Sequence, residues 1–188
     1  MIGLVIVIIL AMMVMHWQEK TKIGRILGLS VNIIITVYMI ISVGRIVIAV
    51  LGGYISPSHL LFSSMTLWTT NILVFALWYW NLDAGGPYQR ELTKGHRVSA
   101  FLFPPTQINF YDTPGLPSWI VNWEPGFIDY LFLAFNTSTA FSPTDTPVIT
   151  RWAKILCMIQ SLIALTIVIM LAARAINILQ IPTNVAMV

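Results

Sequence analysis

The chain has 188 residues, of which 57% are hydrophobic and only 9% are charged, and its formal net charge is +3 at pH 7. Soluble domains carry about 25% charged residues, so this composition excludes a soluble enzyme and indicates an integral membrane protein. The ten basic residues are scattered and form no stripe that could follow nucleic-acid phosphates. The single cysteine, Cys157, excludes an intrachain disulfide and a cysteine-based metal cluster.

Four apolar stretches are long enough, or nearly so, to cross a bilayer as helices. They cover residues 1–17, 26–51, 60–80 and 149–179. A helix needs about 20 mostly apolar residues to span the hydrocarbon core, where every backbone amide must be bonded internally. Residues 1–15 lack a basic leading segment, and no small-residue cleavage site follows them, so we expect a retained helix. The expected fold class is an all-α integral membrane protein with about four transmembrane helices.

A long connection, residues 83–125, follows the third apolar stretch. Its second part is rich in proline and aromatic residues, among them Phe101, Phe103 and Trp123. Aromatic side chains gather where membrane meets water, so we expect an irregular segment that lies on the membrane interface.

Residues 126–138 form a further apolar piece, which is too short to cross the membrane but has the length of a re-entrant helix. The residues that follow, up to residue 147, are rich in hydroxyl side chains. Non-helical backbone is tolerated at membrane depth only where protein buries it or water lines it. The order therefore predicts a half-helix that enters the membrane, a polar loop that returns, and then a full span.

This order resembles the potassium-channel pore-loop superfamily. In that family a TVGYGD filter is followed, at a fixed spacing, by a basic residue at the start of the inner helix. With Asp145 placed on the final acid of the filter, Lys154 falls on that basic residue. The family's threonine-rich entry to the filter then matches Thr137, Ser138 and Thr139.

Two segments, WYWNLDAGGP (78–87) and FNTSTAFSPTDTP (135–147), look more closely like an uncharacterised bacterial family of channel-like integral membrane proteins. The resemblance covers roughly residues 60–179, with motif-level similarity over 129–154. It implies a transmembrane hairpin (1–57) and a pore-loop domain (58–188). The parts of that domain are an outer helix (60–80), an interfacial loop (83–125), a re-entrant helix (126–138), a filter-like loop (139–147) and an inner helix (149–179).

The filter itself departs from the family pattern, because both of its glycines are missing. The candidate pore residues are Thr137, Thr139, Ala140, Phe141, Ser142, Pro143, Thr144 and Asp145. Filter glycines permit the backbone conformations that aim successive carbonyls at a dehydrated ion, whereas Pro143 fixes its own φ. We therefore expect hydroxyl groups and the Asp145 carboxylate to contact a partly hydrated cation, and we expect the pore to select weakly among cations.

Three charged residues have two interpretations each. Asp145 could attract cations at a pore mouth, or it could cap the last helix or pair with Arg151 or Lys154. Arg45 and Arg174 are the basic residues within spans, and each lies about six residues from a helix end. We favour snorkelling of both side chains to lipid headgroups; an inner pore mouth or an anionic-lipid contact is the alternative.

Polar residues also occur in the middle of the predicted spans. They are Asn32, Thr69, Thr70, Asn71, Gln160 and Ser161. Such side chains usually form hydrogen bonds between membrane helices, and Gln160 should face the bundle because exposing an amide to lipid is unfavourable. The three histidines are far apart in the sequence, so we expect no metal site and no cofactor.

The orientation in the membrane receives conflicting indications. The resemblance implies that the 82–148 loop lies outside and both termini inside. The count of lysine and arginine favours the opposite, because eight basic residues lie on the side of this loop and two on the other. Long loops follow the positive-inside rule poorly, so we keep the channel-like orientation.

The sequence hypothesis is passive, weakly selective conduction of monovalent cations by a homotetramer in a bacterial inner membrane. One pore loop surrounds only a quarter of a pore, so conduction requires several copies. A non-conducting scaffold, or an accessory subunit of a larger complex, is the first alternative, favoured by the missing glycines. A membrane enzyme or transporter is the second, and the sequence shows no pairing of a nucleophile with a base to support it.

Overall fold

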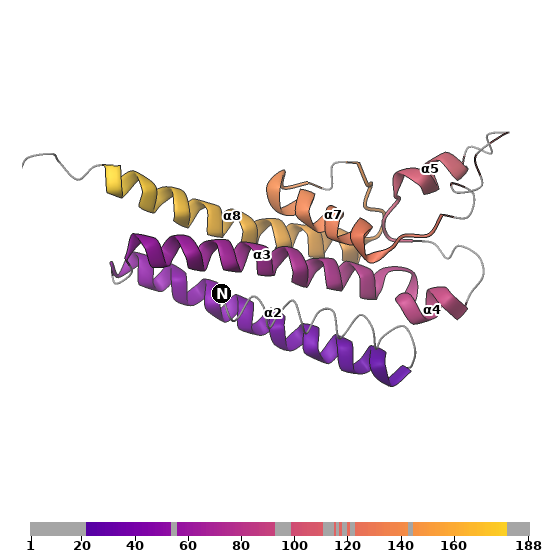
Figure 1. The fold of residues 1–188 in the computed structure, drawn as a ribbon, viewed down its shortest axis with the longest axis horizontal. Helices are drawn as coiled ribbons and strands as arrows, with labels where there is room; N and C mark the ends of the chain where they lie inside the picture. The colour runs from indigo at the N-terminus through magenta and orange to yellow at the C-terminus, as the bar shows by residue number, and fades with distance from the viewer. Residues whose placement is uncertain are drawn as a thin grey trace, which may run out of the picture.

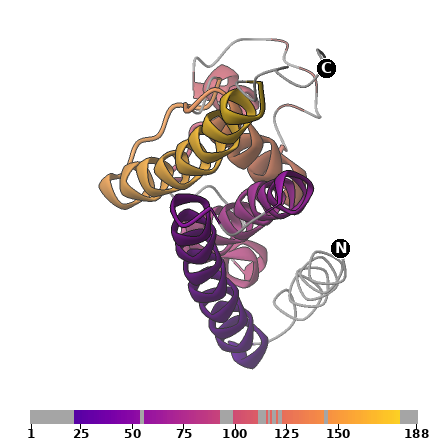
Figure 2. The ribbon, with the colours of Figure 1, turned by 90° about the vertical axis from the view of Figure 1, so that its left-hand side faces the viewer.

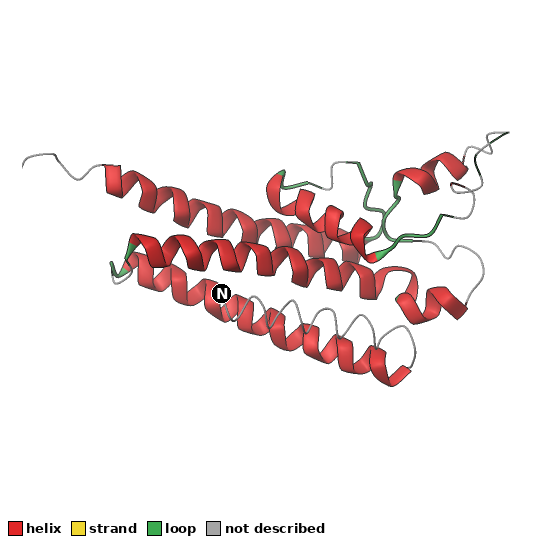
Figure 3. Cartoon of the chain, in the orientation of Figure 1, coloured by secondary structure: helices red, strands yellow, loops and turns green. Residues whose placement is uncertain are grey.

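The computed structural model describes residues 22–53, 56–92, 99–110, 115, 117, 120, 123–142 and 145–179. The described elements are α2 (Lys22–Leu51), α3 (Pro57–Leu82), the 3-10 turn η1 (Asp83–Gly85), α4 (Pro87–Leu92), α5 (Pro104–Phe110), α7 (Phe127–Thr139) and α8 (Arg151–Leu179) (Figure 1). No strand occurs among these residues, as Figure 3 shows. The predicted helix over residues 1–17 lies outside the described residues.

Three of these helices are long and apolar enough to cross a membrane: Gly24–Leu51, His59–Arg90 and Arg151–Ala172. They coincide with three of the four predicted spans, so the sequence prediction of long helices is confirmed there. Helix α7 also forms where the short apolar piece predicted a helix. The structure therefore supports a helical membrane protein with three candidate spans in the described part of the chain.

Helix α3 occupies the centre of the bundle. Figure 2 shows α2 on one side of α3 and α7 on the other. More than half of the most apolar part of α3 is buried (56%), against 11% for α2 and 22% for α8. The outer helices leave large apolar side chains exposed, such as Ile34 and Ile41 on α2 and Leu162 on α8. Apolar faces of this extent are unfavourable in water and suit contact with lipid.

The segment around Phe101 is part of the hydrophobic core. Phe101 is fully buried, and its ring lies between 5.1 and 6.2 Å from the rings of Tyr79, Tyr130 and Trp152. An antiparallel bridge pairs Phe101 with Val148, so this segment is fixed beside the residues that lead into α8.

Phe101 and Phe103 therefore pack inside the bundle and not on its surface. Phe103 is only 4% exposed and packs edge-on against Tyr130. Backbone hydrogen bonds hold the segment on both sides of the bridge: Leu102 N–H donates to the Pro147 carbonyl (3.0 Å), and Ile149 N–H to the Ala100 carbonyl (2.8 Å). This pairing draws the aromatic residues between helices, where burying their rings is more favourable than leaving them at a surface.

Candidate functional site

Helix α7 lies along α3 and α8 and covers only part of their length (Figure 1). Its first residue, Phe127, packs against Trp80 near the end of α3, with 5.8 Å between ring centroids. Two turns later Phe135 packs against Trp68, near the middle of α3, with 6.0 Å between ring centroids. The helix therefore runs antiparallel to α3, from the end of α3 to its midpoint. The chain then returns to the same end of the bundle, where α8 begins.

A buried polar cluster fixes the end of α7. We call it the Gln160 cluster; it comprises Asn71, Tyr79, Ser138 and Gln160, each at most 1% exposed. The Gln160 amide nitrogen donates to the Ser138 hydroxyl (2.8 Å) and to the Ala134 carbonyl (2.7 Å). The Asn71 amide also donates to Ser138, at 3.2 Å. The cluster thus joins α3, α7 and α8 through side-chain hydrogen bonds.

The last turn of α7 receives a further bond. The Ser161 hydroxyl donates to the Thr137 carbonyl (3.3 Å), and the Thr137 hydroxyl donates to the Leu133 carbonyl (2.8 Å). Carbonyls in the last turn of a helix lack partners within the helix. Ser161 on α8 supplies a donor to one of them here, so the end of α7 has a defined position.

A second polar cluster fixes the beginning of α7. We call it the Asp83 cluster; it comprises Asp83, Arg90, Ser99 and Tyr130. The Asp83 carboxylate is fully buried and accepts hydrogen bonds from the Ser99 hydroxyl (2.5 Å), the Ala100 amide (2.6 Å) and the Tyr130 hydroxyl (2.7 Å). Three donors satisfy the carboxylate, as a buried charge requires.

Arg90 supplies the positive charge of the Asp83 cluster. Its guanidinium donates to the Tyr130 hydroxyl (3.1 Å) and to the Asp83 carbonyl (3.1 Å), and it lies 5.4 Å from the centre of the Tyr130 ring. Burial, and then the charge of Asp83, raises the pKa of Tyr130, which lies outside the three candidate spans. The phenol therefore stays protonated and donates to Asp83.

The turn after α3 depends on its glycines. Ala84, Gly85 and Gly86 all have positive φ, of 50°, 85° and 87°. A β-carbon on Gly86 would lie 2.7 Å from the Asn81 carbonyl oxygen, closer than atoms can approach. The sequence Asp-Ala-Gly-Gly therefore makes a tight left-handed turn that directs the Asp83 carboxylate inward.

The predicted pore residues divide into two groups. Thr137 is fully buried within the subunit, whereas the exposed residues follow it: Thr139, Ala140, Phe141, Ser142 and Asp145. The Thr139 hydroxyl donates back to the Phe135 carbonyl (2.9 Å) and keeps a lone pair for another partner. Pro143 and Thr144 lie outside the described residues.

Asp145 has local partners. Its carboxylate accepts a hydrogen bond from the Thr146 hydroxyl (3.1 Å), and its backbone carbonyl accepts one from the Gln107 amide (3.4 Å). No ion pair joins it to Arg151 or Lys154 in the part of the chain that the structure describes. The carboxylate is therefore exposed and free of an ion pair with these two residues, so it can contact a cation.

Arg45 lies far from this loop in the bundle. It is exposed on α2, and helical spacing places it on the same face as the exposed Ile41 and Ile48. Helix α2 packs on α3 and α8. Arg174 lies near the end of α8, and its side chain is not described. The structure thus does not bring Arg45 to the exposed residues after α7.

The prediction of interhelical hydrogen bonds is confirmed for Asn71, Gln160 and Ser161. It is wrong for Thr69 and Thr70, whose hydroxyls donate to the Met65 and Thr66 carbonyls of their own helix. A threonine hydroxyl four residues after a carbonyl reaches it without leaving the helix, so it needs no neighbour. Asn32 is buried, and neither polar atom of its amide has a partner among the described residues.

Sequence reasoning missed the Asp83 cluster. The glycines after Asp83 signalled a turn, but no spacing pattern links residue 83 with residues 99 and 130. Only the folded chain brings them together.

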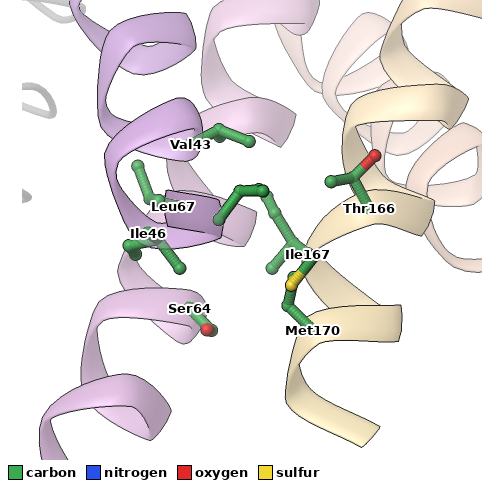
Figure 4. A pocket seen from close by; sticks show the side chains of 8 residues that line it. Val43, Ile46, Ser64, Leu67, Thr166, Ile167 and Met170 are labelled. Carbon is green, nitrogen blue, oxygen red and sulfur yellow. The ribbon is translucent and has the colours of Figure 1, made fainter. Parts of the chain in front are cut away.

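A small crevice lies between α2, α3 and α8 (Figure 4). Its lining residues are Val43, Ile46, Val47, Ser64, Leu67, Thr166, Ile167 and Met170. The Thr166 hydroxyl donates to the Leu162 carbonyl (2.8 Å), and the buried Ser64 hydroxyl has no partner among the described residues. The other lining residues are apolar. In the described residues no group of three or more histidine, cysteine or acidic side chains could hold a metal ion.

Comparison with known proteins gives no assignment. No protein-family model matches the chain, and neither the curated proteins nor the solved structures contain a significant match.

Proposed function

We propose that α7 is a re-entrant helix and that the exposed residues after it line a cation-conducting pore shared by several copies of the chain. The position of the end of α7 along the length of α8 supports this proposal. Gln160 bonds to the end of α7 and lies nine residues after Arg151, the first residue of α8. At 1.5 Å per residue this corresponds to ~14 Å, about half of the ~30 Å hydrocarbon core.

The end of α7 beside the middle of α3 is the single observation that carries the proposal. Directly after this point the backbone is not helical, and Thr139 and Ser142 are exposed. Backbone and hydroxyl groups in that position cannot face lipid, since lipid satisfies none of their hydrogen bonds. Water enclosed by further copies of the same loop does satisfy them.

The chemistry of the loop favours cations that keep part of their hydration shell. Hydroxyl oxygens and the Asp145 carboxylate offer negative charge density, while the filter glycines needed for stacked carbonyls are absent. Transport would be passive, driven by ion gradients, with no cofactor. The resemblance to pore-loop channels suggests a homotetramer in a bacterial cell membrane, with the connection between α3 and α7 outside.

Flux measurements on reconstituted protein test the proposal. Liposomes containing the purified chain should dissipate a potassium or sodium gradient, and Thr139→Val together with Ser142→Ala should slow that flux. Thr69→Val is the matched control, because the Thr69 hydroxyl donates within its own helix and should not affect flux. Gradients that persist across a range of voltages and pH values would rule out conduction.

A non-conducting scaffold or accessory subunit is the second candidate. Thr137 and Ser138 favour this second candidate, because both hydroxyl residues, at the end of α7, are buried and hydrogen-bonded within a single subunit. Their polarity is thus explained by packing alone. Native mass spectrometry separates the candidates: a homo-oligomer supports the pore, whereas a monomer or a hetero-complex of fixed stoichiometry supports the scaffold.

A further inference from the structure

Phe141 has a backbone conformation that is unusual for an aromatic residue. Its φ is +54°, in the left-handed region. Phe141 directly follows Ala140, the C-cap of α7, at a position where a left-handed residue, usually glycine, often ends a helix. The β-carbon of an L-residue crowds the backbone there, at a cost of about 1–2 kcal/mol. A glycine at this position would avoid the crowding, but the chain has a phenylalanine there, between the small exposed residues Ala140 and Ser142.

The ring of Phe141 is only partly covered within its own subunit. It is 44% exposed, and its neighbours Ala140 and Ser142 are exposed as well. By contrast, the backbone just before it is fixed: Ala140 N–H donates to the Asn136 carbonyl (2.8 Å), and the Gln160 cluster holds Ser138. A rigid base therefore presents a large apolar ring at the point where the chain turns back.

We propose that the Phe141 rings of several copies form a hydrophobic constriction that gates the pore. The inference rests on the proposed function, since it requires the loop to face a shared axis. A narrow ring of apolar side chains loses its water and blocks ions without occluding the path sterically. Rotation of the Phe141 backbone out of the left-handed region would release the strain and swing the ring aside, so the open state is accessible at low cost.

Substitutions at Phe141 test the gate through flux. Phe141→Ala removes the ring and should increase cation flux at least about tenfold over the wild-type chain, whereas Phe141→Trp should not increase it. Phe132→Ala is the matched control, because Phe132 is exposed to a similar extent on α7 (51%) but lies away from the turn. Equal flux through the wild-type and Phe141→Ala proteins would reject the gate while leaving conduction intact. Absence of flux from every variant would reject both.

A cross-linking experiment tests the same placement without relying on flux. Cys157 is the single cysteine, so Cys157→Ala provides a background in which one new cysteine reports its own neighbours. Phe141→Cys should form a disulfide-linked pair of subunits under mild oxidation in membranes. Ile48→Cys, on the exposed face of α2, should not. Cross-linking at position 141 no stronger than at position 48 would overturn the proposal.

Discussion

The Tyr79 hydroxyl donates a hydrogen bond to the side-chain amide oxygen of Gln160, at 2.5 Å, and both residues are fully buried. This bond links α3 to α8, while the amide nitrogen of Gln160 links both helices to α7. One side chain thus connects three helices through hydrogen bonds. The position of α7, on which the proposed pore depends, follows from this connection.

Gln160→Leu should destabilise the protein by about 2 kcal/mol, since three hydrogen bonds are lost and membrane-buried bonds contribute up to ~1.7 kcal/mol each. The loss leaves the Tyr79 hydroxyl and Ala134 carbonyl without this partner. Unfolding in mixed detergent, followed by circular dichroism, measures the change. Met158→Leu is the control: Met158 is exposed on the same helix, and its replacement should shift stability by less than about 0.5 kcal/mol. Equal effects of the two substitutions would contradict the role assigned to Gln160.

Asp83→Asn should loosen the attachment to α3 of the segment around Phe101, which Asp83 holds through Ser99 and Ala100. The carboxylate accepts three hydrogen bonds, whereas an amide has one oxygen and turns its NH₂ group toward a donor. We expect a loss of about 1–3 kcal/mol in stability. Hydrogen exchange should be faster at the Ala100 amide, which donates directly to Asp83. Glu124→Gln, at an exposed position, should leave that exchange rate unchanged.

The long helices were predictable because their signal is local. Composition and length identify each apolar run, and the need to satisfy the backbone in lipid then permits only a helix. Gln160 was predicted to face the bundle for the same reason, and it does so. Helix α2 begins four residues before its predicted start, and α3 extends two or three residues beyond each predicted end, because polar residues such as Lys22 continue a helix after the apolar run stops. Helix α8 begins two residues later than predicted, at Arg151.

The two clusters that hold α7 were not predictable, because they depend on contacts between distant residues. Tyr79 is one aromatic residue among several in an apolar run, and nothing near it in sequence indicates a partner at residue 160. The burial of Phe101 was not predicted, because aromatic composition suits both a membrane interface and a core. Its pairing with Val148, which decides between them, is a backbone contact across 47 residues.

Gly86→Ala should destabilise the turn after α3. Its φ is +87°, and the added β-carbon would lie 2.7 Å from the Asn81 carbonyl oxygen. The left-handed conformation alone costs about 1–2 kcal/mol for a residue with a side chain, and the close contact adds to this. Gly44→Ala is a matched control of opposite sign. Gly44 is helical and has open space around it, so alanine should stabilise α2 by up to about 1 kcal/mol. Thermal unfolding in detergent measures both, and a neutral Gly86→Ala would contradict the turn geometry.

Tyr130→Phe should change the dependence of stability on alkaline pH. Burial, and then the charge of Asp83, raises the pKa of Tyr130 above its ordinary value of 10.0. The folded protein therefore retains a proton that the unfolded chain releases above about pH 10, so the contribution of Tyr130 is complete below that pH and declines as pH rises. Tyr130→Phe removes this decline, which amounts to at most ~1.4 kcal/mol per pH unit.

Denaturant titrations between pH 9 and about pH 11 measure this slope. Phe103→Leu is the control, because Phe103 packs 5.2 Å from the Tyr130 ring but carries no proton to lose. It should lower stability at every pH and keep the wild-type slope. A wild-type slope in Tyr130→Phe would show that the phenol ionises equally in both states.

Asp145→Asn should slow cation flux through the proposed pore, and the effect should depend on salt. The Asp145 carboxylate is exposed and has only the Thr146 hydroxyl as a described partner, so its charge acts on nearby ions. Screening extends over ~10 Å at 0.1 M salt but only ~3 Å at 1 M, so the flux ratio of wild type to variant should fall toward one as salt increases. Glu124→Gln removes an equal charge from the connection before α7 and should change flux less at every salt concentration. A ratio that stays constant with salt would mean that Asp145 acts through local structure, such as its bond with Thr146, rather than by concentrating cations at a pore mouth.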